Sequence, residues 1–292
     1  MTENDRALSG FLRSVEADFD DYLESNPDLC EIPDLFTDDY DKMHVEQLYL
    51  LRYVYAYALE NTLMYKWVLE DRKSAANLTV ESIGCGSLVD AWGLKHAAET
   101  LGMATDGIVH TGVDLADWHY KFDSLESTFI QGDAGAYFSE KQSLDSEVYI
   151  FPRSIGDFPE KVFYKIRDAF KFKPITKPVI YLMISQIRSP GSLEVKSRDS
   201  QRTAELMQVL LQRDFDEFRL ACEDDYTEEK LRDHDILFNY PIGLYKKLVN
   251  LHDWCINVGN RDICGGCPMD RSPMLGMKHF SYNVFKFERK AK

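Results

Sequence analysis

The stretch Val80-Glu81-Ser82-Ile83-Gly84-Cys85-Gly86-Ser87-Leu88 runs from an apolar segment through a Gly-x-Gly turn into a helical pattern. Glycine permits positive φ angles and lets a ligand approach the backbone closely. The N-terminus of the following helix offers N–H groups without helical partners and a positive potential. Glycine turns between a strand and a helix are common. The surrounding residues are therefore needed to identify the kind of ligand that this turn binds.

Alternating strand and helix patterns surround this loop. Short β-branched runs predict strands at residues 78–83, 107–114, 128–132, 147–152 and 178–185. Helices are predicted between them at 87–101, 117–125, 134–141 and 158–170. Strands that alternate with helices favour βαβ units and a parallel sheet. We therefore predict an α/β fold in which the glycine loop follows the first strand.

The two ends of the chain have a different character. Apolar residues at helical spacing predict helices at 5–24 and 42–71, with an Asp- and Pro-rich loop at 25–41. Near the C-terminus, residues 200–222 predict an amphipathic helix, and 236–240 and 279–287 have strand-like patterns. The alternation of the last segment fits an antiparallel edge strand. We divide the chain into an α-helical N-terminal cap, 1–76, and a main domain, 77–292, with an insertion at about 243–277.

Acidic residues follow two of the predicted strands. Asp114 ends the second strand, and Asp133 follows the third. The carboxyl ends of neighbouring parallel strands meet at one edge of the sheet, where open α/β folds bind their ligands. We expect Asp114 to reach ribose hydroxyls and Asp133 to reach an adenine amino group. The glycine loop and the two acids together predict a Rossmann-like nucleoside site.

This combination resembles the class I S-adenosylmethionine-dependent methyltransferases, over roughly residues 78–185. Ile83-Gly84-Cys85-Gly86 matches the first motif of that family, and Asp114 and Asp133 match the acids after its second and third strands. The resemblance implies a methyl-transferring enzyme with a Rossmann-like, mostly parallel sheet. It implies that the cofactor is held by Ile83, Gly84, Cys85, Gly86, Asp114, Leu115, Asp133 and Ala134, and we add Arg52 to this set.

Two positions depart from the family pattern. The usual first acid falls at Ser82, and the usual third glycine is Leu88. Glu81 or Asp90 could take the place of the missing acid near the methionine amine. Leu88 and its neighbour disfavour a dinucleotide fold, which needs the last glycine of G-x-G-x-x-G for close helix packing. An NAD-dependent enzyme and a non-catalytic Rossmann-like binding protein remain as alternatives.

Few features of the sequence bear on the identity of the methyl acceptor. The fourth predicted strand leads into Phe151-Pro152-Arg153, which differs from the Asn/Asp-Pro-Pro-Tyr/Phe pattern of enzymes that methylate base or glutamine nitrogens. Arg153 could pair with an acidic acceptor or with the cofactor carboxylate, and His119 could act as a base; both also fit surface or core roles. Arg52 lies in an apolar helix, where a buried guanidinium needs an anionic partner.

The net charge of the chain and the composition of its segments limit the classes of partner that we expect. Of a formal net charge of -15, residues 1–41 hold thirteen Asp and Glu against two Arg. A net-negative surface disfavours nucleic acid as a partner. We expect a small-molecule acceptor, and a peptide or a protein side chain stays open. The acidic segment is either a solvated helix face with a loose connector or a docking surface for a basic partner. Without a signal-peptide pattern or a long apolar run, we expect a cytoplasmic protein that does not span a membrane.

Three cysteines lie close together in the insertion. Cys255, Cys264 and Cys267 could bind a structural zinc ion, because Cys-Gly-Gly-Cys forms the tight turn that brings two thiolates to one metal. The fourth ligand would come from His252, His279 or Cys222. The alternative is that they are free thiols of an irregular segment.

Overall fold

The computed structural model describes residues 3–29, 42–122, 124–187, 193–223, 240–260, 272–275 and 280–290. Its centre is a seven-stranded sheet with the order β3-β2-β1-β4-β5-β7-β6. The strands are β1 (Thr79–Ile83), β2 (Val109–Asp114), β3 (Thr128–Gln131), β4 (Val148–Phe151), β5 (Val179–Ile187), β6 (Phe215–Glu223) and β7 (Phe280–Arg289). The first five strands are parallel, and β7 runs antiparallel to both β5 and β6. The predicted α/β fold with a mostly parallel sheet is confirmed.

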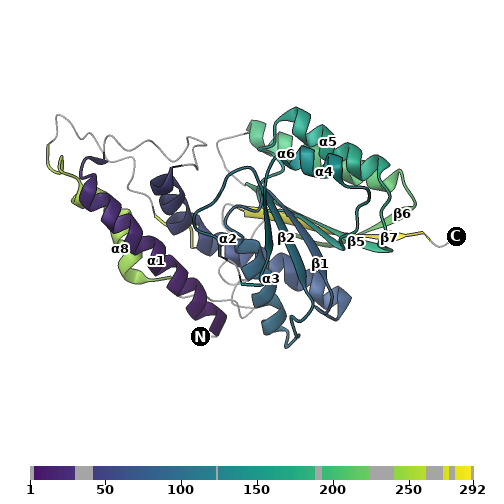
Figure 1. The fold of residues 1–292 in the computed structure, drawn as a ribbon, viewed down its shortest axis with the longest axis horizontal. Helices are drawn as coiled ribbons and strands as arrows, with labels where there is room; N and C mark the ends of the chain where they lie inside the picture. Colours follow the sequence, from purple (N-terminus) through teal and green to yellow (C-terminus); the bar gives the residue numbers. More distant parts are fainter. Residues whose placement is uncertain are drawn as a thin grey trace.

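Helices cover both faces of this sheet. They are α1 (Glu3–Ser25), α2 (Met43–Arg72), α3 (Val89–Thr100), α4 (Ala134–Glu140), α5 (Glu160–Phe172), α6 (Leu193–Leu211) and α8 (Ile242–Val249), with a short 3-10 helix η2 (Leu251–Trp254). Figure 1 shows α4, α5 and α6 on one side of the sheet and α2 and α3 on the other. None of the described helices is long and apolar enough to cross a bilayer.

Strand alternation divides the core into two clusters. Val80 of β1 packs with α2 and α3, whereas Ile83 packs with α4, α5 and α6. Successive side chains of a strand point to opposite faces, so one short strand contributes to both clusters. Helix α2 is buried around most of its circumference, which is the pattern of a helix inside a core.

The prediction of a helix at 117–125 is wrong. The described residues of this segment form bends and irregular backbone. The carboxylate of Glu46 accepts the backbone N–H groups of His119 and Tyr120, at 3.1 and 2.6 Å, and Phe122 donates its N–H to the carbonyl of Ser87. The N–H of Phe122, which a helix over 117–125 would have used internally, is thus taken by a carbonyl outside the segment.

The prediction of one helix over 200–222 is also wrong. Helix α6 ends at Leu211, and β6 begins four residues later and pairs with β7. The strand expected at 279–287 is β7, which is antiparallel as predicted, but the edge position belongs to β6. A long-range pairing therefore overrides the local helical pattern of this segment. The strand expected at 236–240 lies almost wholly outside the described residues.

The C-terminal segment packs against the N-terminal helix, as the neighbouring α8 and α1 ribbons in Figure 1 show. The ammonium group of Lys247 in α8 lies 3.0 Å from Glu16 and 2.6 Å from Asp20 of α1. The backbone N–H of Ile256 donates to the carbonyl of Pro27 at 2.8 Å. Part of the acidic face of α1 is thus paired within the chain.

Candidate cofactor-binding site

The glycine loop has the backbone conformation that its sequence predicts. Gly84 and Gly86 have φ angles of 71° and 54°, in the region that side chains other than glycine rarely adopt. A Cβ atom at Gly84 would collide with the side chain of Ser154, whose hydroxyl donates to the carbonyl of Ile83. The N–H of Gly84 donates to the carbonyl of Val113 at 2.8 Å, which ties the loop to the end of β2.

Asp114 is held directly beside this loop. One carboxylate oxygen accepts the N–H of Gly86 at 2.8 Å, and the other accepts the N–H of Ala116 at 3.0 Å. Burial raises the pKa of Asp114, and these hydrogen bonds oppose part of the rise. The backbone of Leu115 and the side chain of Trp118 also interact with this carboxylate and lower its pKa. The following residue, Leu115, is 75% exposed.

Asp133 lies at the same edge of the sheet and caps a helix. Its side chain accepts the N–H of Ala136 at 2.7 Å at the start of α4, whose first residue, Ala134, is buried. The N–H of Gly132 donates to the carbonyl of Asp114 at 2.8 Å. The ends of β2 and β3 are therefore joined next to the glycine loop.

A recess opens between the glycine loop, helix α2 and the end of β4. It is lined by Tyr49, Tyr57, Glu60, Asn61, Gly84, Cys85, Gly86, Ser87, Val89, Asp90, Pro152 and Arg153. Sequence reasoning had placed the loop and Arg153 near a site, but it missed Glu60 and Asn61. The signal was present, because two adjacent polar residues interrupt an apolar stretch of α2.

Glu60 holds Arg153 at the wall of this recess. The guanidinium Nε and Nη2 donate to the two carboxylate oxygens of Glu60 at 3.0 and 3.2 Å. Ser185 donates to Glu60 at 2.7 Å, and the guanidinium lies over the ring of Tyr57, 4.6 Å from its centroid. Glu60 is only 1% exposed, and burial raises its pKa. The positive charge of Arg153 is thus matched by a carboxylate of its own chain.

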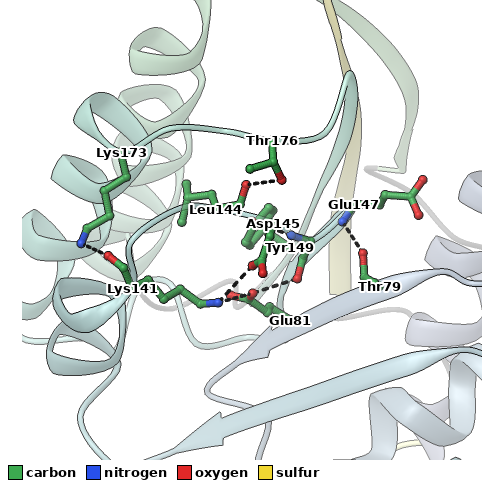
Figure 2. Close-up of polar contacts among 10 residues, drawn as sticks. Thr79, Glu81, Lys141, Leu144, Asp145, Glu147, Tyr149, Lys173 and Thr176 are labelled. Atoms are coloured by element: carbon green, nitrogen blue, oxygen red, sulfur yellow. Dashed lines mark hydrogen bonds and ion pairs between the residues drawn. The ribbon is translucent and has the colours of Figure 1, made fainter.

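The two acids proposed for the missing motif position lie in different places. Glu81 lies close to Lys141, as Figure 2 shows, and accepts a hydrogen bond from it at 2.8 Å. It accepts a second from Ser146, also at 2.8 Å, next to the start of β4. It does not line the recess. Asp90, in the first turn of α3, does line it, and one of its oxygens lies 2.8 Å from Nε2 of His110.

Arg52 and His119 do not line the recess. Arg52 is buried on another side of α2, where its carbonyl accepts the N–H of Met274. The His119 side chain is 58% exposed, and its Nδ1 lies 3.8 Å from the carboxylate of Glu46. The structure brings Arg153, the glycine loop and Asp114 together, and it places Arg52 and His119 elsewhere.

The proposed zinc ligands are only partly covered by the structure. Cys255 is buried as a free thiol, whereas Cys264 and Cys267 lie outside the described residues. Within the described part of the chain, no three His, Cys, Asp or Glu side chains gather in a metal-binding group.

Comparisons with known proteins give only distant structural matches. No protein-family model matches the sequence, and no curated protein matches it. The plantazolicin methyltransferase BpumL is 12% identical with a TM-score of 0.41, over 99% of this chain and 98% of its own. A TehB-like SAM-dependent methyltransferase from Corynebacterium glutamicum is 13% identical with a TM-score of 0.36, over 77% and 88%. The YcgJ protein from Bacillus subtilis is 8% identical with a TM-score of 0.40, over 79% and 99%. With sequence identities and TM-scores this low, the activity or acceptor of these proteins is not assigned to this chain.

The strand order is more informative. A sheet ordered 3-2-1-4-5-7-6, in which only the seventh strand is antiparallel, carries a glycine loop after β1 and an acid after β2. The ligand site of such a sheet lies at the carboxyl ends of its central strands, where this recess lies. By this topology, the chain has the fold of the class I S-adenosylmethionine-dependent methyltransferases.

Proposed function

We propose that this protein binds S-adenosylmethionine at the glycine loop and transfers its methyl group to a small-molecule acceptor. The observation that carries the proposal is the carboxylate of Asp114, held 2.8 Å from the N–H of Gly86 at the end of the neighbouring strand. This pair of groups suits a ribose, because the carboxylate can accept hydroxyl groups and the glycine backbone lets the ligand approach closely. When bound, the cofactor would supply an electrophilic methyl group on a sulfonium.

The charges around the loop favour this cofactor over NAD. A pyrophosphate would lie at the N-terminus of α3, where a nearby carboxylate would oppose the attraction of the helix dipole. That turn carries Asp90 in the recess, and the nearby Arg153 is already paired with Glu60. A carboxylate repels a pyrophosphate and attracts a cation.

The chain's own contribution to methyl transfer would be alignment and exclusion of water. In-line displacement needs the acceptor and the methyl group held in line, with little covalent help. Tyr49 and Tyr57 form an aromatic wall of the recess, and the pair of Arg153 with Glu60 forms a polar corner beside it. Arg153 is the better acceptor-side candidate, because His119 is exposed outside the recess.

Thermal unfolding with added ligands tests the proposal. A ligand at a hundred times its Kd stabilises a protein by about 2.7 kcal/mol. We expect S-adenosylmethionine and S-adenosylhomocysteine to raise the Tm and NAD to leave it unchanged. A Tm that rises only with NAD would favour the dehydrogenase alternative, and no shift with any nucleoside ligand would favour a non-catalytic protein.

The residue-level test is Asp114→Ala. Loss of one or two charge-assisted hydrogen bonds, each worth about 1.5 to 3 kcal/mol, should weaken S-adenosylhomocysteine binding at least about tenfold. Asp117→Ala is the matched control, since that side chain lies in the same segment and is 65% exposed. Calorimetry that shows equal affinities for the two variants would contradict the role of Asp114. Transfer of label from methyl-labelled cofactor into the small-molecule fraction of a cell extract would test the acceptor class.

A further inference from the structure

Two buried side-chain oxygens of residues that line the recess have no hydrogen-bond partner in the described part of the chain. They are Oδ1 of Asn61, on α2, and Oδ1 of Asp90, on α3. The residues are 3% and 1% exposed, and both line the recess beside the glycine loop. Buried acceptors in native proteins are nearly always hydrogen-bonded, so a pair without partners in one recess indicates a missing donor.

The surroundings hold Asp90 firmly. Its other carboxylate oxygen lies 2.8 Å from Nε2 of His110 and 3.5 Å from the hydroxyl of Tyr65, and all three groups are buried. Both contacts are made by Oδ2, whereas Oδ1 has no partner among the described residues. The carboxylate is therefore oriented before any ligand binds.

Asn61 is fixed by the close crossing of α2 and α3. A Cβ atom at Gly93 of α3 would lie 2.8 Å from the Cβ of Asn61, so only glycine permits this approach of the two helices. The crossing brings the amide of Asn61 and the carboxylate of Asp90 to the same recess. The recess therefore has two acceptor groups, an amide oxygen and a carboxylate oxygen. Such a pair suits a donor that carries positive charge.

An ammonium group has three N–H donors and a positive charge, which matches this pair. S-Adenosylmethionine carries one such group, on its methionine portion. The position next to the loop where the family usually has an acid is Ser82 here, and Glu81 is engaged by Lys141 and Ser146 away from the recess. Among the described residues that line the recess, Glu60 is paired with Arg153, and Asp90 is the other acid.

We propose that Asn61 and Asp90 bind the α-ammonium group of the cofactor, so that helices α2 and α3 supply the contact that β1 lacks. This inference rests on the proposed function. It makes Asp90 and Asn61 cofactor-binding residues, and His110 a positioning residue that orients the carboxylate.

The test compares two ligands by calorimetry: S-adenosylhomocysteine and its analogue with hydrogen in place of the α-amino group. Wild-type protein should bind the amino compound at least about tenfold more tightly. In Asp90→Asn, which keeps the side-chain shape and an acceptor for His110, this preference should fall to about twofold or less. Affinity for the analogue should stay the same or rise, because a like charge near its carboxylate has been removed.

Two further variants keep the test decisive. Asn61→Ala retains the Cβ at the helix crossing and should lower the preference for the amino compound severalfold, which applies even if Asp90→Asn does not fold. Glu81→Gln is the matched control and should leave the preference unchanged. Equal loss of affinity for both ligands in Asp90→Asn, or loss of the preference in Glu81→Gln, would overturn the assignment. Failure of the wild-type protein to bind either ligand would instead overturn the proposed function.

Discussion

Several residues that line the recess carry a buried charge, and Glu60 is the clearest example. Its carboxylate is buried on a helix and receives hydrogen bonds from Arg153 and Ser185, which follow it by 93 and 125 positions in the chain. A buried ion pair adds little net stability, but removal of one partner leaves a buried charge. Glu60 therefore fixes Arg153 at the wall of the recess.

Replacement of Glu60 by Ala should lower the free energy of unfolding by about 3 to 5 kcal/mol, because Arg153 loses its carboxylate partner inside the core. Glu60→Gln should cost less, since an amide can still accept the hydrogen bond of Ser185. Urea denaturation measures both. Glu70→Ala, at an exposed position of the same helix, is the control and should stay within about 0.5 kcal/mol of wild type. A small effect of Glu60→Ala would contradict a buried pair.

Asp114 should make cofactor affinity depend on pH. Burial raises its pKa above the ordinary value of 3.8, so its carboxyl protonates at a higher pH than in the unfolded chain. The protonated form is a poorer acceptor for ribose hydroxyls, and we expect S-adenosylhomocysteine affinity to fall as the pH drops through this raised pKa. Titration calorimetry across mildly acidic pH measures the trend, which Asp114→Asn should flatten.

The pKa of Asp114 also affects the stability of the protein without ligand. This contribution to the free energy of unfolding should decrease as the pH rises, whereas cofactor affinity should increase. Because the folded state binds the Asp114 proton more tightly than the unfolded state, this group's contribution is fully present below the unfolded pKa. It is lost as the pH rises through the folded pKa. The free energy of unfolding of the wild type relative to Asp114→Asn should therefore decrease as the pH rises through that window. An increase would contradict the raised pKa.

At the scale of elements, the segment after β2 acts as a strap over the glycine loop. Trp118 packs near Gly86, where an added Cβ would lie 3.5 Å from its ring. The strap is held by Glu46 through two backbone N–H groups, and the hydroxyl of Tyr120 donates to Asp18 of α1 at 2.7 Å. Helices α1 and α2 thus position the loop through this segment.

Replacement of Glu46 by Ala should loosen the strap, because it removes the acceptor of two N–H groups. We expect a several-fold loss of S-adenosylhomocysteine affinity together with a loss of about 1 to 3 kcal/mol in unfolding free energy. His119→Ala is the matched control, since only its backbone N–H takes part in the main contact and its side chain is exposed. Hydrogen exchange should be faster at residues 118–122 in the Glu46 variant. Unchanged exchange there would contradict the strap.

At the scale of the whole molecule, the N-terminal and C-terminal segments stabilise each other. Lys247 of α8 lies half-buried between Glu16 and Asp20 of α1. Burial by itself would lower its pKa, but the hydrogen bonds that it donates to the two acids raise the pKa of Lys247 above its ordinary value. The apolar residues of α1 belong to the same core cluster as those of α2 and of α8. The acidic helix is therefore part of the folded core on one side.

Replacement of Lys247 by Ala should lower the free energy of unfolding by about 1 to 2 kcal/mol, less than for a fully buried pair because solvent screens part of the interaction. Thermal and urea unfolding measure the loss. Lys246→Ala, at the exposed neighbouring position, is the control and should have little effect. Cofactor affinity should stay within about twofold of wild type in both variants. Equal stabilities would mean that α8 is held by apolar contacts alone.

The glycine loop and its acid could be predicted from the sequence because both depend on local rules. Gly84 and Gly86 follow a strand and precede a helix, and Asp114 ends the next strand. Parallel strands bring such residues to one edge in any sheet of this kind. The helix at 117–125 was predicted wrongly, because contacts with Glu46, more than seventy positions away, and with Ser87 hold this segment in another conformation.

The sequence by itself determined the α/β fold, the strands that lead to the glycine loop, and the place of Asp114, since these follow from periodicity and from glycine's backbone freedom. Only the tertiary structure decided which helix faces meet the loop. The crossing of α2 over Gly93 brings Asn61 and Asp90 to one recess, and the end of β4 brings Arg153 to Glu60. Packing between distant segments sets these contacts, and no local pattern in the chain encodes which buried polar groups come together.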